Sequence, residues 1–286
     1  MKNKILSLVL VYVIYIVAFI GGYFSGLWIN NIYLKLFFMD VIATIIIWVF
    51  SIFLKNTSLY DPYWSLTPWV IATYLMIHLR ISNVYTFIVY IVFSIWSWRL
   101  TINWMITFDD IYWEDWRYKM YREKLHPVIY EGLNLLGLQM MPTVLVYSGL
   151  LPLLVMIVNG ANIYAIIGVF IIFAGILFEF FADHQMHSYL KSSKEKKVCY
   201  VGLWKYTRHP NYLGENLIWI GLYVSLVVSL PQYWYLFYGA LLILLLFEFV
   251  SIPMMEKRQI GRRPDYLDYQ KTTPRLVPFT KFNRKD

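Results

Sequence analysis

The sequence has 286 residues, of which 59% are hydrophobic, 20% aromatic and only 15% charged, and its formal net charge is +8. Soluble domains average about 45–50% apolar and roughly a quarter charged residues, so this composition argues against a soluble fold. Long apolar runs of about 18 or more residues predict transmembrane helices, because lipid offers the backbone no hydrogen-bonding partner. The expected fold class is an all-α, polytopic membrane protein.

In chain order, eight apolar runs predict spans at residues 5–24, 33–53, 66–79, 84–98, 133–158, 163–181, 213–230 and 233–250. The third and fourth runs are short and are separated only by the stretch around Arg80. No linker divides the chain, so residues 1–286 are predicted to form one membrane domain. Its polar parts are predicted as cytoplasmic loops at 99–131 and 182–212 and a cytoplasmic C-terminal segment at 251–286.

The basic residues predict the orientation of these spans. With the N-terminus inside and eight crossings, Lys35 and Arg80 are the two exceptions among 25 Lys and Arg that otherwise lie on the cytoplasmic side. This distribution agrees with the positive-inside bias of short loops. We therefore expect seven to eight spans, with both termini in the cytoplasm if the number is eight.

The positive charge thus reports topology rather than nucleic-acid binding, which would need a basic face on a soluble domain. The single cysteine, Cys199, excludes an internal disulfide and a CxxC motif. The first run is too long for a signal peptide and lacks a small-residue cleavage site, which predicts an uncleaved helix. The expected partners are the lipid bilayer and a lipophilic small molecule, with no obligate protein partner. The expected location is a bacterial inner membrane in preference to an endoplasmic reticulum.

Glycines at 21, 22 and 26 do not form a phosphate-binding loop, because no GxGxxG pattern and no following Lys-Ser/Thr is present. Gly22 and Gly26 have the GxxxG spacing that lets two membrane helices pack closely. The structural interpretation is favoured for these glycines.

A second polar pattern stands near the cytoplasmic end of the sixth run. Glu179 and Asp183 are one helical turn apart, and His184 and His187 follow within the next turn and a half. Carboxylate and imidazole at such spacing can converge on a metal ion. Polar residues are expected at a helix exit in any case, so no metal site is predicted.

The segment GLWKYTRHPNYLGE, residues 202–215, leads directly into the seventh run. Asn211 is a good candidate for the N-cap of this helix, and Glu215 in its first turn complements the positive helix end. Uncapped amides at this position, preceded by Arg208 and His209, favour binding of an anionic group such as a phosphate.

The chain resembles the superfamily that joins steroid 5-alpha reductases and isoprenylcysteine carboxyl methyltransferases. More narrowly, it resembles an uncharacterised branch close to the steroid 5-alpha reductases. The resemblance covers most of residues 57–279 and is most specific in its last hundred. It rests on DPYW at 61–64, EDWRY at 114–118, the Glu179/Asp183 helix, GLWKYTRHPNYLGE, IPMMEKR at 252–258 and a Tyr-rich tail ending in VPF.

The resemblance to the steroid 5-alpha reductases implies NADPH as cofactor, bound among the later helices and cytosolic loops without a Rossmann fold. The family's dinucleotide contacts fall on Asp183, Tyr206, Asn211 and Arg258, and Glu215 and Trp219 also match the family pattern. Lys197, with Arg117 or Arg208, is the implied partner of the 2′-phosphate. His209 and Tyr212 of the RHPNY motif and the late Glu256 complete the implied cofactor-binding set.

The substrate end of the family pattern matches less well. The steroid enzymes polarise a ketone with a glutamate and with a tyrosine that stands shortly before an arginine. Here the arginine is best matched by Arg99, and Trp96 stands three positions before it. An acid such as Asp61, or Tyr60 or Tyr63 beside it, is the expected catalytic group. This departure argues against steroid specificity and leaves the implied cofactor unchanged.

Three functions follow from these patterns. The favoured one is an NADPH-dependent reductase of a lipophilic, steroid-like or isoprenoid, enone double bond, with hydride transfer to the β-carbon. The alternative is an S-adenosylmethionine-dependent methyltransferase of a membrane lipid or prenyl-cysteine, which shares the Arg208–Tyr212 and Glu256/Arg258 elements. A transporter or assembly factor is the third, although only Asp40 and Glu248 stand within the apolar runs as midspan charges.

Overall fold

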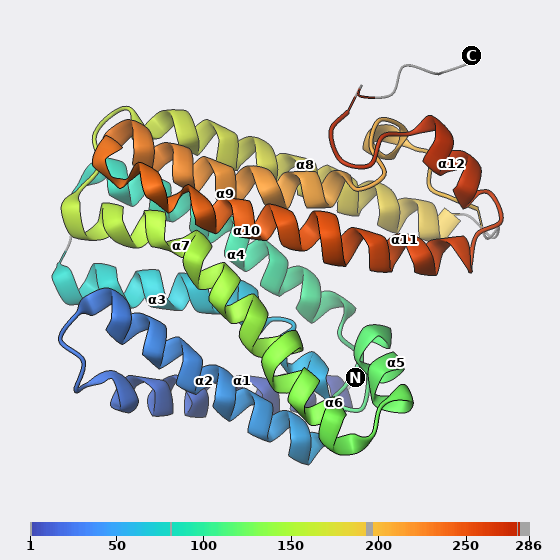
Figure 1. Cartoon of the computed structure of the whole chain (residues 1–286), viewed down its shortest axis with the longest axis horizontal. Helices are drawn as coiled ribbons and strands as arrows, with labels where there is room; N and C mark the ends of the chain where they lie inside the picture. Colours follow the sequence, from blue (N-terminus) through green and yellow to red (C-terminus); the bar gives the residue numbers. More distant parts are fainter. Residues whose placement is uncertain (1, 81, 193–196, 279, 281–286) are drawn as a thin grey trace. The chain divides into compact units, whose positions relative to one another are not determined.

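The computed structural model describes residues 2–80, 82–192, 197–278 and 280, and within these ranges every regular element is helical (Figure 1). The longer helices are α1 (Lys2–Gly26), α2 (Ile32–Leu54), α3 (Tyr63–Leu79), α4 (Val84–Thr107), α7 (Met141–Asn159), α8 (Ala165–Ser192), α9 (Pro210–Ser229) and α10 (Phe237–Leu246). The shorter ones are α5 (Trp116–Lys124), α6 (Pro127–Leu133), α11 (Ile252–Ile260) and α12 (Tyr266–Thr272). The prediction of an all-α polytopic membrane protein is confirmed.

Short 3₁₀-helical and π-helical segments connect some of these elements. The 3₁₀ segments are η1 (Thr57–Tyr60), η3 (Gly202–Lys205) and η4 (Pro231–Leu236). Two π-helical segments, η2 (Asn134–Met140) and η5 (Phe247–Ser251), join α6 to α7 and α10 to α11. Each junction therefore continues one long helix with a local bulge, as is common for single π turns.

Among the described residues, seven helical stretches are long and apolar enough to cross a membrane. They overlap all the predicted spans except residues 66–79, which lie in α3. That helix has 17 residues, at the lower end of the range of about 17–25 residues that span a bilayer. The helices also run beyond the apolar runs, since α4 continues to Thr107 and α8 to Ser192. The loops predicted at 99–131 and 182–212 are correspondingly shorter.

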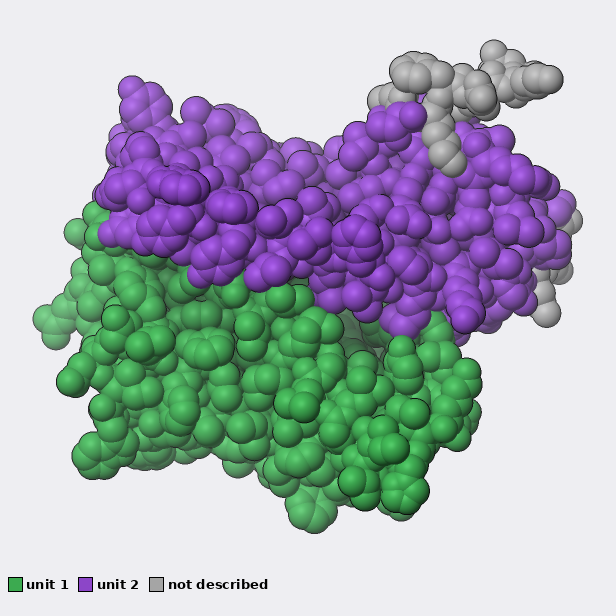
Figure 2. All heavy atoms as spheres, in the orientation of Figure 1, with its two compact units in different colours: residues 1–82, 93–159 green, residues 83–92, 160–286 purple. Residues whose placement is uncertain are grey.

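The helices group into two compact units, which Figure 2 colours separately. Unit 1 consists of Met1–Ser82 and Phe93–Asn159, and unit 2 of Asn83–Val92 and Gly160–Asp286. One boundary between the units falls within α4, and the other two fall beside helix ends at 82/83 and 159/160, so no long linker in the sequence marks the division.

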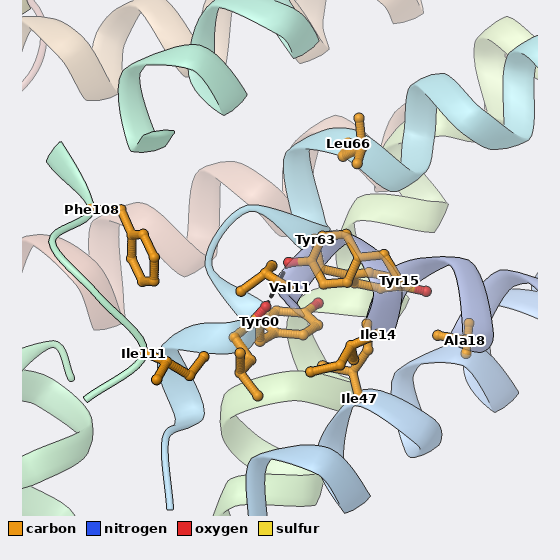
Figure 3. Close-up of a cluster of buried hydrophobic side chains, with 12 residues drawn as sticks. Val11, Ile14, Tyr15, Ala18, Ile47, Tyr60, Tyr63, Leu66, Phe108 and Ile111 are labelled. Carbon is orange, nitrogen blue, oxygen red and sulfur yellow. Dashed lines mark hydrogen bonds between the residues drawn. The ribbon is translucent and has the colours of Figure 1, made fainter. Parts of the chain in front are cut away.

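Unit 1 has a core of aromatic and aliphatic side chains, shown in Figure 3. The Tyr15 ring meets the Tyr63 ring edge to face at 5.7 Å between centroids, and the Tyr15 hydroxyl donates to the Leu59 carbonyl at 2.5 Å. Gly22 of α1 lies against the α2 backbone, because a Cβ there would meet the Met39 carbonyl oxygen at 2.5 Å. The close helix packing predicted from GxxxG is confirmed at this position.

Unit 2 is built around the antiparallel pair α8 and α9. Four glycines let the two backbones touch: a Cβ on Gly175 or Gly214 would meet the other's carbonyl oxygen at 2.6 Å, and one on Gly221 would meet that of Gly168 at 2.8 Å. Since any side chain larger than a hydrogen would force the helices apart, these contacts fix the position of the α9 N-terminus beside the end of α8.

The C-terminal segment folds back on the start of α9. The Arg208 amide donates to the Pro274 carbonyl at 2.9 Å, and the Thr207 hydroxyl donates to the Leu276 carbonyl at 2.8 Å. Arg208 and Thr207 are both buried by this contact. The tail is therefore part of the wall around the α9 N-terminus.

Candidate functional site

A cavity of about 740 Å³ lies within unit 2 and is lined by residues of α8, α9, α11 and α12 and of the segments that connect them. Ligand pockets commonly enclose about 300–1,000 Å³. Its lining comes from five parts of the chain: Asp183, Met186, His187 and Leu190; Val198, Cys199 and Trp204; Arg208, His209, Asn211 and Tyr212; Met255, Gln259, Gly261, Arg262 and Arg263; and Tyr266 and Tyr269.

The helix α9 begins at Pro210, with His209 as its N-cap residue, so the prediction of Asn211 as N-cap is wrong. Proline is favoured at the first helical position because its ring fixes φ and because the amide it lacks would have no partner there. Asn211 and Tyr212 therefore occupy the next two positions. The His209 side chain makes no cap hydrogen bond and instead stacks on the Tyr212 ring at 5.4 Å. The first amides of α9 are thus left without a side-chain cap beside the cavity.

Arg208 is a fixed part of the cavity wall. Its Nε donates to Glu256 Oε1 at 2.7 Å, and its Nη1 donates to the Thr273 and Gln270 carbonyls at 2.5 and 3.1 Å. The Arg208 and Glu256 side chains are only 6% and 7% exposed. This guanidinium therefore ties α9, α11 and the C-terminal segment together.

His209 shares the same carboxylate, with Nε2 at 3.1 Å from Glu256 Oε1. Burial lowers the pKa of His209 below its usual value, although Glu256 opposes that shift. The imidazole is therefore neutral near pH 7, and since a carboxylate only accepts, its Nε2 carries the proton. His209 offers a flat, neutral surface toward the cavity.

Of the residues predicted to bind a cofactor, the cavity brings together Asp183, Arg208, His209, Asn211 and Tyr212. Glu256 stands directly behind two of them.

The other predicted cofactor residues lie outside the lining. Glu215 and Trp219 are buried and bonded to each other, with Trp219 Nε1 donating to Glu215 Oε1 at 2.8 Å. Lys197 and Tyr206 are exposed, and Arg258 is half-buried on α11. Arg117 belongs to unit 1.

A second group of polar residues surrounds Asp61 in unit 1. The Tyr118 hydroxyl donates to Asp61 Oδ1 at 2.6 Å, and Arg117 Nη2 lies 3.7 Å from the same oxygen. Arg117 Nε also donates to Asp115 Oδ1 at 2.7 Å. Burial raises the pKa of Asp61 to about 6, because Arg117 and Tyr118 offset the desolvation only in part. Asp61 can therefore exchange a proton near neutral pH.

Tyr60 and Tyr63 flank Asp61 in sequence and belong to the unit 1 core drawn in Figure 3, yet their hydroxyls bond to other residues. The Tyr60 hydroxyl pairs with Thr143 Oγ1 at 2.7 Å, and the Tyr63 hydroxyl donates to Asp40 Oδ1 at 2.7 Å. Both tyrosines are at most 2% exposed. Among the described residues, the hydroxyls of Tyr60 and Tyr63 thus bond to groups other than Asp61, whose carboxylate accepts from Tyr118.

Several cavity residues were missed by sequence reasoning. Gln259, Arg262, Arg263 and Tyr266 reach the lining because the turn between α11 and α12 brings them there. Tyr118 was noted only as part of the EDWRY motif. The two adjacent arginines before Pro264 are visible in the sequence as a basic pair. The sequence does not show which helices this pair packs against.

Glu179, Asp183, His184 and His187 do not converge. Glu179 is buried, His187 lines the cavity and His184 is exposed against the Phe180 ring. Within the described part of the chain, no three His, Cys, Asp or Glu side chains are placed to share a metal ion.

The fold and the cavity define an all-α, polytopic membrane protein with a partly open cavity, lined by polar and apolar side chains, in one of its helical units. A family model described as "Protein of unknown function (DUF1295)" matches residues 47–273, and the chain belongs to that family. Comparison with curated proteins and with solved structures gives no match.

Proposed function

We propose that this protein is a membrane-embedded, NADPH-dependent reductase that acts on a lipophilic, steroid-like or isoprenoid, enone double bond. The main support is that Asp183, Arg208, His209, Asn211 and Tyr212, which match cofactor positions of the steroid 5-alpha reductases, line one cavity. Asp183 lies on α8, whereas the other four residues follow one another at and just before the start of α9. Tertiary packing brings these two segments to one cavity, and this contact supports the proposal.

The cavity has the chemistry that a dinucleotide requires. The first turn of α9, which has no side-chain cap, carries Asn211 and Tyr212 at the positive end of the helix, where a diphosphate would be favoured. The stacked rings of His209 and Tyr212 offer a flat face for a base, and the Asp183 carboxylate can accept from a ribose hydroxyl. Arg208 and Glu256 hold this wall rigid. NADPH, when bound, would supply the hydride.

The Asp61 group supplies the proton chemistry in this proposal. Reduction of an enone places negative charge on the carbonyl oxygen, which a donor must stabilise and a proton must finally neutralise. Asp61, with its pKa raised to about 6 and with Tyr118 bonded at 2.6 Å, can hold a proton near neutral pH. Tyr60 and Tyr63 would have to leave their core partners to act, so Asp61 is the stronger choice.

A second function has one observation in its favour. The resembling methyltransferases share the Arg208–Tyr212 motif and a late glutamate, and here Glu256 binds both Arg208 and His209. The same cavity could therefore hold S-adenosylmethionine and transfer a methyl group to a membrane lipid or prenyl-cysteine.

One experiment separates the two functions. The detergent-purified protein is heated with NADPH or with S-adenosylhomocysteine, and its unfolding temperature is recorded. A ligand at a hundred times its dissociation constant stabilises the folded state by about 2.7 kcal/mol. We expect a clear shift with NADPH. A shift with S-adenosylhomocysteine alone would reject the reductase.

Asn211→Ala tests the location of the cofactor. Removal of one hydrogen-bonding side chain at the start of α9 should weaken NADPH binding by about two- to tenfold, since a hydrogen bond contributes about 0.5–1.5 kcal/mol. Lys205→Ala is the matched control, because Lys205 is exposed nearby and does not line the cavity. Equal NADPH affinity in both variants and the wild type would show that the dinucleotide binds elsewhere.

A further inference from the structure

The basic residues expected to hold a 2′-phosphate are engaged or lie outside the cavity. Arg208 is buried and already bonds Glu256 and two backbone carbonyls. Arg117 belongs to unit 1 and bonds Asp115. Lys197 is exposed and is not part of the lining. A different group must recognise the phosphate if the cavity holds NADPH rather than NADH.

Two other arginines line the cavity from the turn between α11 and α12. The amides of Arg262 and Arg263 both donate to the Gln259 carbonyl, at 3.0 and 2.9 Å, which fixes the turn that carries them. Arg263 Nε also donates to Gln259 Oε1 at 2.9 Å, and its Nη1 donates to the Lys197 carbonyl. The pair is therefore held at the cavity by backbone as well as side-chain contacts.

The charge of this pair is not matched by a carboxylate. Within the described residues, neither Arg262 nor Arg263 makes an ion pair, and the exposed Arg262 guanidinium makes no hydrogen bond. The nearby Asp265 accepts from the Val198 amide at 3.0 Å instead. Asp183, the acidic residue in the lining, belongs to α8. Two guanidinium groups with spare donors thus face one cavity.

Resting on the proposed function, we propose that Arg262 and Arg263 bind the 2′-phosphate of NADPH and so set the preference for NADPH over NADH. Guanidinium donors arranged as a planar fork match the oxygens of a phosphate monoester, and such charge-assisted bonds are stronger than neutral ones. Arg262 is the principal contact, because Arg263 already uses two of its donors within the protein. Gln259 positions both arginines.

The test compares ligands that differ in one phosphate. Dissociation constants of NADPH and NADH are measured for the full-length protein in detergent, together with adenosine 2′,5′-bisphosphate and adenosine 5′-monophosphate. The variants are Arg262→Gln and Arg263→Gln, and Lys257→Gln serves as the control because Lys257 is exposed on α11 outside the lining. Unfolding temperatures without ligand identify any variant that is merely destabilised.

We expect the wild type and Lys257→Gln to prefer NADPH to NADH. Arg262→Gln should weaken NADPH and the bisphosphate by about 10- to 100-fold, the range for a hydrogen bond between charged groups, and leave NADH and the monophosphate unchanged. Inorganic phosphate should compete with the bisphosphate only weakly, which separates a dinucleotide site from a general phosphate or lipid-headgroup site.

The outcomes distinguish the two proposals. If both dinucleotides bind equally well to the wild type, or if both arginine variants keep the preference for NADPH, the assignment of the arginines is wrong and the reductase proposal stands. If neither dinucleotide binds, the reductase proposal itself fails. Inorganic phosphate competing as strongly as the bisphosphate would also overturn the assignment.

Discussion

Two clusters of charged residues differ in how far their side chains are exposed to solvent. The Arg208 group, formed by Arg208, His209, Glu256 and Gln270 in unit 2, has its arginine and glutamate side chains 6% and 7% exposed. The Asp61 group in unit 1, formed by Asp61, Asp115, Arg117 and Tyr118, has Arg117 37% and Asp61 14% exposed. Both pair one arginine with acidic partners, yet their ionisation differs.

The ionisation of the two groups differs because the two arginines lie at different distances from the carboxylates. Arg208 contacts Glu256 at 2.7 Å, so that carboxylate stays charged and the group acts as a structural clamp. Arg117 lies 3.7 Å from Asp61 and closer to Asp115, so burial dominates and raises the pKa of Asp61 to about 6. The short Arg208–Glu256 ion pair therefore stabilises the structure, whereas the longer Arg117–Asp61 pair leaves the Asp61 carboxyl able to titrate near neutral pH.

Arg208→Met should have the largest effect on this comparison. Removal of one partner of a buried ion pair leaves Glu256 buried and charged, which destabilises a protein by about 3–5 kcal/mol. The unfolding temperature in detergent is the measurement. The double variant Arg208→Met with Glu256→Leu should recover much of the loss, since it removes the orphaned charge. A double variant as unstable as the single one would contradict the clamp.

The Asp61 group predicts a smaller effect that depends on pH. The folded pKa of Asp61 is about 6, above the unfolded value of about 3.9, so the folded state binds the extra proton. Stability from this group is present at about pH 4 and is lost as pH rises through about 6, by up to about 3 kcal/mol. Asp61→Asn should remove this part of the pH dependence.

The control for this second prediction is Asp115→Asn, which keeps the Asp61 carboxyl and removes a neighbouring charge that raises its pKa. Its loss of stability should be smaller and should be complete at a lower pH than in the wild type, because only the folded pKa of Asp61 is lowered. Identical pH profiles for the wild type and Asp61→Asn would mean that Asp61 titrates normally and would remove it as a proton donor.

Much of the fold could be predicted because lipid forces apolar segments into helices. The ends of those helices were less predictable, because hydropathy shows only where the apolar residues end. The helical backbone hydrogen bonds continue beyond that point into polar sequence. This explains why α8 extends to Ser192 and α4 to Thr107. The start of α9 could have been predicted from the preference of proline for the first helical position. This preference places Pro210 at that position and makes His209, rather than Asn211, the N-cap residue.

The candidate site was predictable where one segment carries it and unpredictable where segments meet. His209, Asn211 and Tyr212 are close in sequence, and the cavity contains all three. Arg262 and Arg263 enter from a separate turn that only tertiary packing places. The same limit applies to side-chain direction, because nothing in the sequence shows that the Tyr60 and Tyr63 hydroxyls bond to Thr143 and Asp40.

The smallest expected effect compares two glycines, one in each unit. Gly214 stands on α9 just after the cavity residues, and an added Cβ would meet both the Gly175 carbonyl oxygen and Glu179 Cγ at 2.6 Å. Gly132 is exposed on α6, and a Cβ there would meet nothing within 4 Å. Gly214→Ala should cost about 1–3 kcal/mol through overpacking, and Gly132→Ala should stabilise by about 0.5–1 kcal/mol through higher helix propensity.

The same two variants also test whether the packing of α8 against α9 affects ligand binding in the cavity. Because α9 carries Asn211 and Tyr212, displacement of this helix from α8 in Gly214→Ala should weaken NADPH binding as well as lower the unfolding temperature. Gly132→Ala should leave NADPH affinity unchanged. If Gly214→Ala were as stable as the wild type and bound NADPH equally well, the α8 and α9 contact could not be what positions the cavity, and Arg208 alone would have to hold it.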